Sequence, residues 1–89
     1  MKDIRWSTQF SRRYKQRIAK NEQLTEEFWD SIDTFRINPA LVDNHPLEDV
    51  MQGKRAFSIN DEYRVVYIER DEYFLFLNVG THEQVYRRS

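Results

Sequence analysis

Five polar residues in the second half of the chain have side chains that can act together on a phosphodiester. Lys54 and Arg55 open one strand-like run, while Arg64 lies early in the next and His82 and Tyr86 follow the last. Cleaving RNA without a metal needs a base for the 2′-hydroxyl proton, an acid for the departing 5′-oxygen and cations that stabilise the charged transition state. An imidazole, a guanidinium and a phenol can fill these roles. The five residues therefore form a candidate site for RNA cleavage.

Each of the three central residues also has a structural interpretation. A histidine after a Gly-Thr turn, as His82 is, can be a surface or capping residue. Arg64 can pair with a carboxylate, and Tyr86 can pack in the core. The residue types alone leave the site a candidate.

Other chemistries find little support in the residue types. The chain has no cysteine and only two histidines, His45 and His82, and it contains no His-x-x-x-His or Asp-rich loop. Phosphate-binding loops, serine-hydrolase elbows and dinucleotide fingerprints are also absent from the sequence. We therefore expect no metal and no cofactor.

The first half of the chain predicts a strand and two helices. Residues 3–6 alternate apolar and polar side chains, which favours a strand. Phe10, Tyr14 and Ile18 recur every four residues, which predicts an amphipathic helix from a cap at residue 7 or 8 to about residue 20. A second helix is expected to begin after Thr25 as its N-cap and to end at Asn38, before a proline.

The second half predicts an antiparallel meander. Residues 40–53 show no sustained period and are interpreted as a long connection, and strands are expected over residues 55–60, 63–70 and 73–79. The last two runs are apolar on both faces, so these strands should be covered on both sides or lie at the centre of the sheet. The helices are expected to cover one face and a partner chain the other. Residues 81–88 are expected to form a short tail. The predicted fold is a single α+β domain over residues 1–89: an N-terminal strand, a two-helix hairpin and a twisted antiparallel sheet.

Length and composition set further limits. A chain of 89 residues has room for one hydrophobic core. No signal peptide or run of about 20 apolar residues is present, so we expect a cytoplasmic protein that does not enter a membrane. The formal net charge is −1, with net charges of +6 over residues 1–20, −7 over residues 21–50 and 0 over residues 51–89. Such blocks are typical of solvated helix faces, and a basic surface for phosphate beside an acidic one is the alternative.

Four short motifs in order resemble the RelE/ParE toxin superfamily, and most closely its RelE/YafQ branch. They are His45-Pro46-Leu47, the run from Gly53 to Ile59, Tyr63-Arg64-Val65-Val66-Tyr67, and Gly80-Thr81-His82 with Val85-Tyr86-Arg87. The resemblance implies two N-terminal helices packed on a twisted antiparallel sheet. It also implies a toxin that cleaves mRNA in the ribosomal A site to inhibit translation, and an antitoxin partner encoded beside it.

The same resemblance assigns roles to residues. It implies that Arg64 contacts the scissile phosphate, that His82 is catalytic and that Tyr86 orients the nucleotide. RNA binding is implied for basic and polar residues around them: Lys54, Arg55, His45 and Arg87.

Two other functions fit the same motifs. The ParE branch shares the fold and inhibits DNA gyrase without cleaving RNA, although its members typically lack a histidine at the position of His82. A catalytically degenerate toxin could act only as an antitoxin-binding module. The near-neutral charge of the chain is unusual for a protein that binds rRNA, and the acidic second helix would have to face away from the ribosome.

Overall fold

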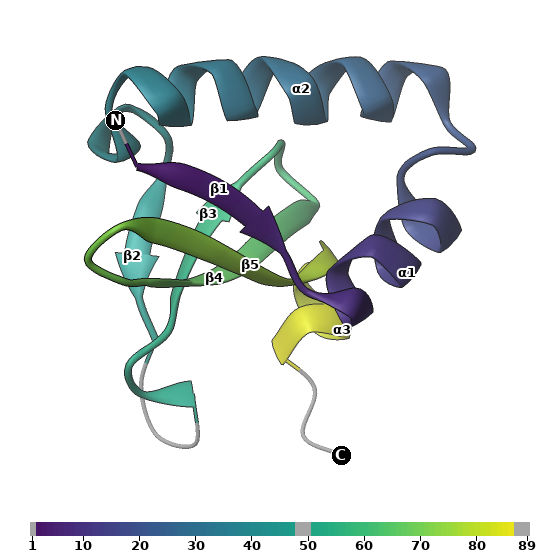
Figure 1. Ribbon diagram of the computed structural model, residues 1–89. Helices are drawn as coiled ribbons and strands as arrows, with labels where there is room; N and C mark the ends of the chain where they lie inside the picture. Colours follow the sequence, from purple (N-terminus) through teal and green to yellow (C-terminus); the bar gives the residue numbers. More distant parts are fainter. Residues whose placement is uncertain (1, 48–50, 87–89) are drawn as a thin grey trace.

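The computed structural model describes residues 2–47 and 51–86, which form a five-stranded sheet between helices (Figure 1). The strand order across the sheet is β1-β5-β4-β3-β2. Along the chain the elements are β1 (Asp3–Trp6), α1 (Thr8–Arg17), α2 (Glu22–Ile37), the 3-10 helix η1 (Pro39–Leu41), β2 (Asn44–Pro46), β3 (Arg55–Ser58), β4 (Tyr63–Glu69), β5 (Tyr73–Thr81) and α3 (His82–Tyr86). The predicted α+β fold, with its N-terminal strand, helix pair and antiparallel strands, is confirmed.

The N-terminal strand β1 lies at one edge of the sheet. It pairs in parallel with β5, so that Ile4 lies opposite Phe74 and Trp6 opposite Phe76. Ser7 then caps α1, because its hydroxyl accepts a hydrogen bond of 3.0 Å from the backbone N–H of Phe10. The sheet is therefore mixed, with a parallel pair at one edge of an antiparallel meander.

The second helix begins earlier than the sequence pattern predicted. Asn21 is its N-cap, and the Asn21 side chain accepts from the N–H of Leu24 at 3.0 Å. The predicted cap, Thr25, lies inside the first turn, where its hydroxyl donates to the carbonyl of Ile18 at 3.0 Å. A threonine hydroxyl can cap the helix that follows it or donate to a carbonyl at the end of the preceding helix, so the residue type alone did not decide between these two roles. The predicted end at Asn38 is confirmed.

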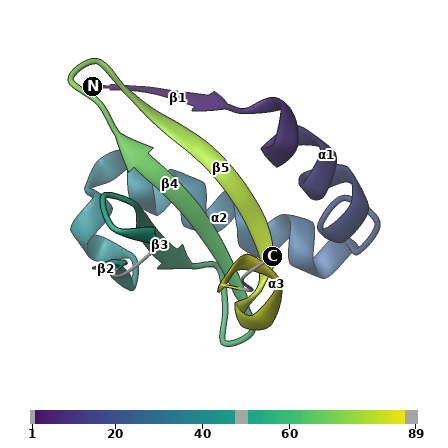
Figure 2. The same ribbon diagram turned by 90° about the horizontal axis from the view of Figure 1, so that it is seen from below.

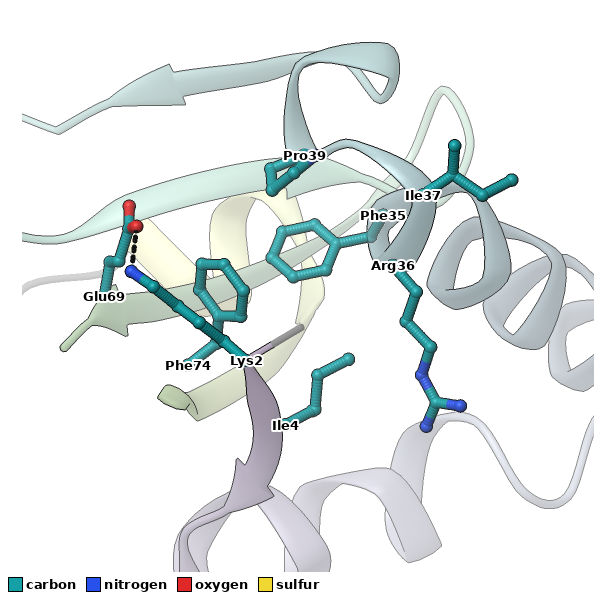
Figure 3. A pocket seen from close by; sticks show the side chains of 8 residues that line it. All are labelled: Lys2, Ile4, Phe35, Arg36, Ile37, Pro39, Glu69 and Phe74. Carbon is teal, nitrogen blue, oxygen red and sulfur yellow. Dashed lines mark hydrogen bonds and ion pairs between the residues drawn. The ribbon is translucent and has the colours of Figure 1, made fainter. Parts of the chain in front are cut away.

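Phe35 of α2 lies at the centre of the main core, which fills the space between the helices and the sheet. Its ring contacts the ring of Phe74, drawn beside it in Figure 3, at 4.8 Å between centroids. It also contacts the rings of Phe57, Tyr67 and Phe76 at 4.9, 5.2 and 5.7 Å. Most of these pairs are edge-to-face, the arrangement that aromatic quadrupoles favour. One helix side chain thus joins three neighbouring strands.

A bulge in β5 changes which side chains face this core. Val66 lies opposite Asn78 whereas the next residue, Tyr67, lies opposite Phe76, so Leu77 is the extra residue in β5. Strand side chains alternate between faces, and one extra residue reverses the alternation. Phe76 and Val79 therefore both reach the main core although they are three positions apart. Beyond the bulge, the odd-numbered residues of β5 face the helices and the even-numbered ones face away.

The connection predicted over residues 40–53 contains structure that the sequence pattern did not predict. Asn44–Pro46 form β2, an edge strand in which His45 lies opposite Ala56 of β3. Three residues are too few to show a period, and proline is usual only on an edge strand, where one side of the backbone needs no partner. Within the described residues, no helix is both long and apolar enough to cross a membrane.

Replacing Phe35 with alanine should lower the free energy of unfolding by about 3–5 kcal/mol, because the substitution leaves a cavity among four aromatic rings. Ile37, two residues along the same helix, is 76% exposed. Ile37→Ala is the matched control and should change the stability by no more than about 0.5 kcal/mol. Urea unfolding followed by circular dichroism measures both values, and equal losses in the two variants would contradict the assignment of Phe35 to the core centre.

Candidate functional site

The segment that was predicted as a C-terminal tail contains a short helix, α3, which packs on the sheet face opposite α2 (Figure 2). Thr81 and Gln84 form a capping box: the N–H of Thr81 donates to Gln84 Oε1 at 2.9 Å, and the N–H of Gln84 donates to the Thr81 hydroxyl at 3.2 Å. Val85 is buried against Ala56 and Val66 and holds the helix on the sheet. A threonine followed three residues later by glutamine is a signal that sequence reasoning could have used to find this helix.

α3 places His82 and Tyr86 side by side. They are four residues apart, so they lie on one face of the helix, and their ring centroids are 4.4 Å apart in an edge-to-face arrangement. The backbone N–H of His82 donates to the carbonyl of Glu62 at 3.0 Å, which ties the start of α3 to the start of β4. His82 is exposed and Tyr86 is half-buried. The two side chains predicted to act on RNA therefore lie together, and His82 is open to solvent.

Arg64 on β4 belongs to the same face of the sheet. It lies opposite Gly80 on one side and Ser58 on the other. Its Nη1 donates to the carbonyls of Asn60 at 2.8 Å and Tyr63 at 3.1 Å. No carboxylate of the described residues forms an ion pair with it, so the ion-pair interpretation of Arg64 finds no support there. The remaining guanidinium donors are available to an anion.

The electrostatics of Tyr86 join these residues into one site. The pKa of Tyr86 is raised above its ordinary value of 10.0, first because burial disfavours the phenolate; the Arg64 guanidinium opposes this shift and the Asp43 carboxylate adds to it. The Tyr86 hydroxyl is buried and has no hydrogen-bond partner among the described residues. An unpartnered buried hydroxyl is uncommon in native proteins, so Tyr86 is left with an unused hydrogen-bond donor beside Arg64.

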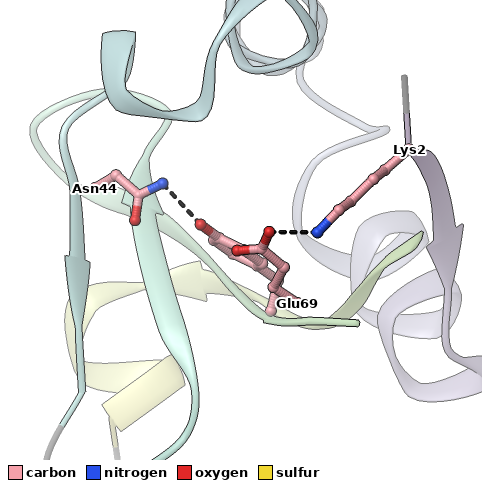
Figure 4. Close-up of polar contacts among 4 residues, drawn as sticks. Lys2, Asn44 and Glu69 are labelled. Carbon is pink, nitrogen blue, oxygen red and sulfur yellow. Dashed lines mark hydrogen bonds and ion pairs between the residues drawn. The ribbon is translucent and has the colours of Figure 1, made fainter. Parts of the chain in front are cut away.

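Arg55 does not join this group. It lies opposite Tyr67, a residue of the main core, and therefore faces the helices. Its Nε donates to Asn44 Oδ1 at 3.0 Å, and the Asn44 amide, labelled in Figure 4, donates to the Tyr67 hydroxyl at 2.7 Å. This chain of hydrogen bonds fixes β2 against the core, so the structure places Arg55 in a structural network on the face opposite Arg64.

His45 and Lys54 extend from the site towards the other edge of the sheet. His45 on β2 is exposed and lies opposite Ala56 on β3. Ala56 packs against Val85 of α3, so His45 is on the sheet face that α3 covers. Lys54 is one residue before β3, where the alternation that places Ala56 on this face also places Lys54. His45 and Arg64 lie two strands apart, roughly 10 Å across the sheet. Arg87, the remaining predicted RNA-binding residue, lies outside the described residues.

One residue near the site, Asp43, was not predicted. Asp43 accepts from the Ser58 hydroxyl through Oδ2 at 3.2 Å and brings a carboxylate close enough to affect the pKa of Tyr86. Asp43 directly precedes β2, and a polar run of aspartate, asparagine and histidine before a proline was the only signal for it. No group of three or more His, Cys, Asp or Glu residues that could hold a metal ion occurs in the part of the chain that the structure describes.

Gly80 allows α3 to approach β5 closely. A Cβ atom at this position would lie 2.6 Å from Gln84 Oε1 and 2.7 Å from Arg17 Nη1. The first atom belongs to the capping box, and Arg17 Nη1 donates to the carbonyl of Val79 at 3.0 Å. Both contacts need the space that a side chain at position 80 would fill.

Residues 2–87 match the model of a protein family described as YafQ, the bacterial toxin of a type II toxin-antitoxin system. The chain belongs to the YafQ toxin family. It is therefore a type II toxin, and the resemblance stated from its motifs is confirmed. A search of curated protein sequences found no significant match.

Solved structures show the same fold in other toxins. YafQ from E. coli strain BL21(DE3) has a TM-score of 0.79 and 23% identity, with 97% of this chain and 99% of that chain covered. YafQ in a crystal structure of the E. coli DinJ-YafQ complex has a TM-score of 0.75 and 25% identity, with the same coverage. A YoeB/ParE toxin from Agrobacterium tumefaciens has a TM-score of 0.75 and 20% identity, with 90% and 98% covered. The YafQ fold thus extends over nearly the whole chain.

The raised pKa of Tyr86 predicts a pH dependence of stability in this YafQ-family toxin. Below about pH 10 the phenol is protonated in both the folded and the unfolded chain. Above that pH the unfolded chain loses the proton first, so the contribution of Tyr86 to stability is lost as the pH rises through the folded-state pKa. The free energy of unfolding of wild type should therefore fall, relative to Tyr86→Phe, as the pH rises above about 10.

Denaturant unfolding of both proteins across this pH range measures the difference between their free energies of unfolding. The other tyrosines are present in both proteins, so their contributions cancel. Asp43→Asn should bring the pKa of Tyr86 closer to its ordinary value, and Arg64→Leu should raise it further. Parallel pH profiles for wild type and Tyr86→Phe would show that the Tyr86 hydroxyl does not sense its surroundings as described.

Proposed function

We propose that this type II toxin is a metal-independent endoribonuclease that cleaves mRNA in the ribosomal A site and so inhibits translation in the cytoplasm. The whole chain, residues 1–89, would act as one RelE-like domain. The observation that carries the proposal is the convergence of Arg64, His82 and Tyr86 on one sheet face, where the charge of Arg64 influences the pKa of Tyr86. Membership of the YafQ toxin family supports it.

Arg64 supplies the cation of the proposed reaction. A phosphodiester gains negative charge on its oxygens in the transition state, and fixed donors that are in place beforehand stabilise that charge. The hydrogen bonds from Nη1 to two backbone carbonyls hold the guanidinium in position before any substrate arrives. We assign Arg64 to the scissile phosphate because it has no carboxylate partner among the described residues to compete with an anion.

His82 and Tyr86 supply the proton chemistry. Imidazole accepts and donates protons near neutral pH, and exposed His82 can be reached by both the 2′-hydroxyl and the leaving 5′-oxygen of a bound RNA. Tyr86 is protonated at neutral pH, since the ordinary pKa of a tyrosine is 10.0 and burial raises the pKa of Tyr86 further. Tyr86 can thus donate a hydrogen bond to the RNA, and its ring can stack on a base.

The RNA strand would run from α3 towards β2. His45 and Lys54 continue the polar surface in that direction. His45 is two strands from Arg64, roughly 10 Å across the sheet, and Lys54 is four positions along β3 from Ser58, the partner of Arg64, which is roughly 13 Å. These two side chains would contact nucleotides on one side of the scissile bond. We assign RNA binding to His45, Lys54 and Arg87, whereas Arg55 is assigned a structural role because it faces the core.

The basic side chains of α1 are the proposed rRNA contact. Arg12 and Lys15 of α1 and Lys20 in the turn after it are exposed, while Arg17 donates a hydrogen bond to the carbonyl of Val79 and supports β5. The acidic residues of α2 lie on a different element, so the basic face does not need to share its surface with them. An antitoxin is the proposed protein partner, as YafQ is found with DinJ in the E. coli complex.

Single-turnover cleavage of mRNA on programmed ribosomes tests the chemistry. Arg64→Ala should lower the rate about 100- to 1,000-fold through lost charge stabilisation, and His82→Ala about 100- to 10,000-fold through lost proton transfer. Tyr86→Phe keeps the ring, so a small loss would make Tyr86 a positioning residue and a large loss a proton donor.

Arg70→Ala, in an exposed turn away from the site, is the control for the Arg64 substitution and should cut at the wild-type rate. Circular dichroism confirms that each variant is folded. Wild-type rates in both folded Arg64→Ala and folded His82→Ala would exclude this site. An inactive wild type that instead triggers a DNA damage response in cells would favour gyrase inhibition, and one that does neither would favour a binding module.

Reversing two charges on α1 tests ribosome binding. Arg12→Glu with Lys15→Glu should weaken co-sedimentation with ribosomes by roughly 10-fold at low salt, and the difference should shrink as salt is added. Arg36→Glu with Arg70→Glu changes the net charge equally away from α1 and should weaken binding much less. If both pairs behave alike, ribosome binding depends on net charge and not on this face.

A further inference from the structure

A pocket of about 360 Å³ lies at the opposite end of β5 from α3. β1, the C-terminal end of α2 and the neighbouring ends of β4 and β5 enclose it. Its lining residues are Lys2, Ile4, Phe35, Arg36, Ile37, Pro39, Glu69 and Phe74 (Figure 3). Phe74 is the second residue of β5 and Thr81 is its last, so the pocket and the candidate RNA site are separate parts of the surface.

The pocket has an apolar floor and a polar rim. The rings of Phe35 and Phe74 form the floor with Ile4, and the side chain of Lys2 crosses Phe74 to form an ion pair with Glu69 (Figure 3). Ile37 stands at the mouth with 76% of its surface exposed. Large apolar side chains exposed beside an apolar pocket indicate a surface that a partner covers.

A second hollow continues this pocket along β1 and makes a groove. It is lined by Lys2, Asp3, Ile4, Arg5 and Arg36, three of which also line the first pocket. Three of the five are cations. Arg5 stacks on Tyr73 at 4.1 Å, and Arg36 has no ion-pair partner among the described residues. The groove along β1 is therefore basic next to an apolar pocket.

β1 also offers backbone hydrogen bonds at this groove. It is an edge strand, outermost in Figure 2. The N–H of Asp3 donates to the carbonyl of Glu72, in the turn before β5, at 3.3 Å, and the N–H of Ser7 donates to the carbonyl of Phe76 in β5 at 3.0 Å. In a parallel ladder alternate residues bond to the same neighbour, so the backbone groups of Ile4 and Trp6 point to the open edge. An extended segment can pair with them.

We propose that this groove binds an extended segment of the antitoxin, which adds a strand to the edge of β1, inserts a large apolar side chain above Phe35 and Phe74 and places an acidic side chain near Arg36. The proposal rests on the proposed function, which supplies an antitoxin as the partner. The apolar floor favours a polypeptide over RNA as the occupant, because RNA recognition relies on flat stacking surfaces and phosphate contacts and not on a closed aliphatic and aromatic pocket.

The position of the groove has a functional consequence. It lies at the far end of β5 from Arg64, His82 and Tyr86, so binding there leaves those three side chains uncovered. The groove would thus anchor the antitoxin to the toxin, and another part of the antitoxin would have to inhibit RNA cleavage. Substitutions in the groove should then weaken neutralisation without changing the activity of the free toxin.

Titration calorimetry with the purified full chain and the co-encoded antitoxin protein tests the proposal. Arg36→Glu together with Ile37→Glu should weaken binding about 10- to 100-fold, because the pair loses an apolar contact and repels an acidic segment. Leu41→Glu is the matched control: Leu41 is 61% exposed and close in sequence but does not line the pocket. It should change the affinity less than about 2-fold.

Amide hydrogen exchange provides a second measurement. It uses the wild-type protein alone, so the result does not depend on the stability of a variant. In the wild-type complex the amides of Ile4 and Trp6 should exchange more slowly than in the free toxin, as an added strand requires. Unchanged exchange, wild-type affinity of the Arg36→Glu, Ile37→Glu protein, or an equal loss in Leu41→Glu would each overturn the proposal. So would variants that bind the antitoxin normally but lose RNA binding, because the groove would then belong to RNA.

The experiments distinguish an error in the proposed location of antitoxin binding from an error in the proposed function. If wild type binds no antitoxin at all, both the groove and the antitoxin partner are wrong. If wild type binds the antitoxin tightly and the groove variants do too, the partner stands and only the location is wrong. Neither result depends on whether the toxin cleaves RNA.

Discussion

The single extra residue in β5 decides which side chains meet on each face of the sheet. With Leu77 outside the pairing, Phe74, Phe76 and Val79 all contribute to the core under α2, and Gly80 turns to the other face, opposite Arg64. A strand without the bulge would turn Val79 away from the core and place a different residue beside the guanidinium. The packing of the core and the position of the candidate site thus depend on the same irregularity.

Much of the fold could be predicted from local sequence patterns that extend over several residues. The recurrence of Phe10 and Ile18, the proline after Asn38 and the apolar runs of β4 and β5 each carry a clear signal, and the structure confirms the elements they predict. The elements that were missed have three and five residues, β2 and α3, and both are held by tertiary contacts. Short elements depend on their neighbours, which a local pattern does not contain.

The candidate site could be predicted in residue type but only partly in position. Lys54 and Arg55 are neighbours in sequence, yet strand alternation sends them to opposite faces, and without the register of β3 nothing shows which one faces Arg64. His82 and Tyr86 could be placed together only once α3 was known to be a helix. Asp43 was missed because its influence on Tyr86 arises from a strand pairing between distant segments.

The parallel pairing of β1 with β5 joins the start of the described chain to its last strand. Ser7 and Leu77 are in contact although they are 70 positions apart, so this contact closes nearly the largest loop available to the chain. During synthesis the helices can form early, but β1 has no partner until β5 has left the ribosome. The order of translation therefore delays completion of the sheet, and the edge groove and the Gly80 end of β5 come into existence together in the final step of folding.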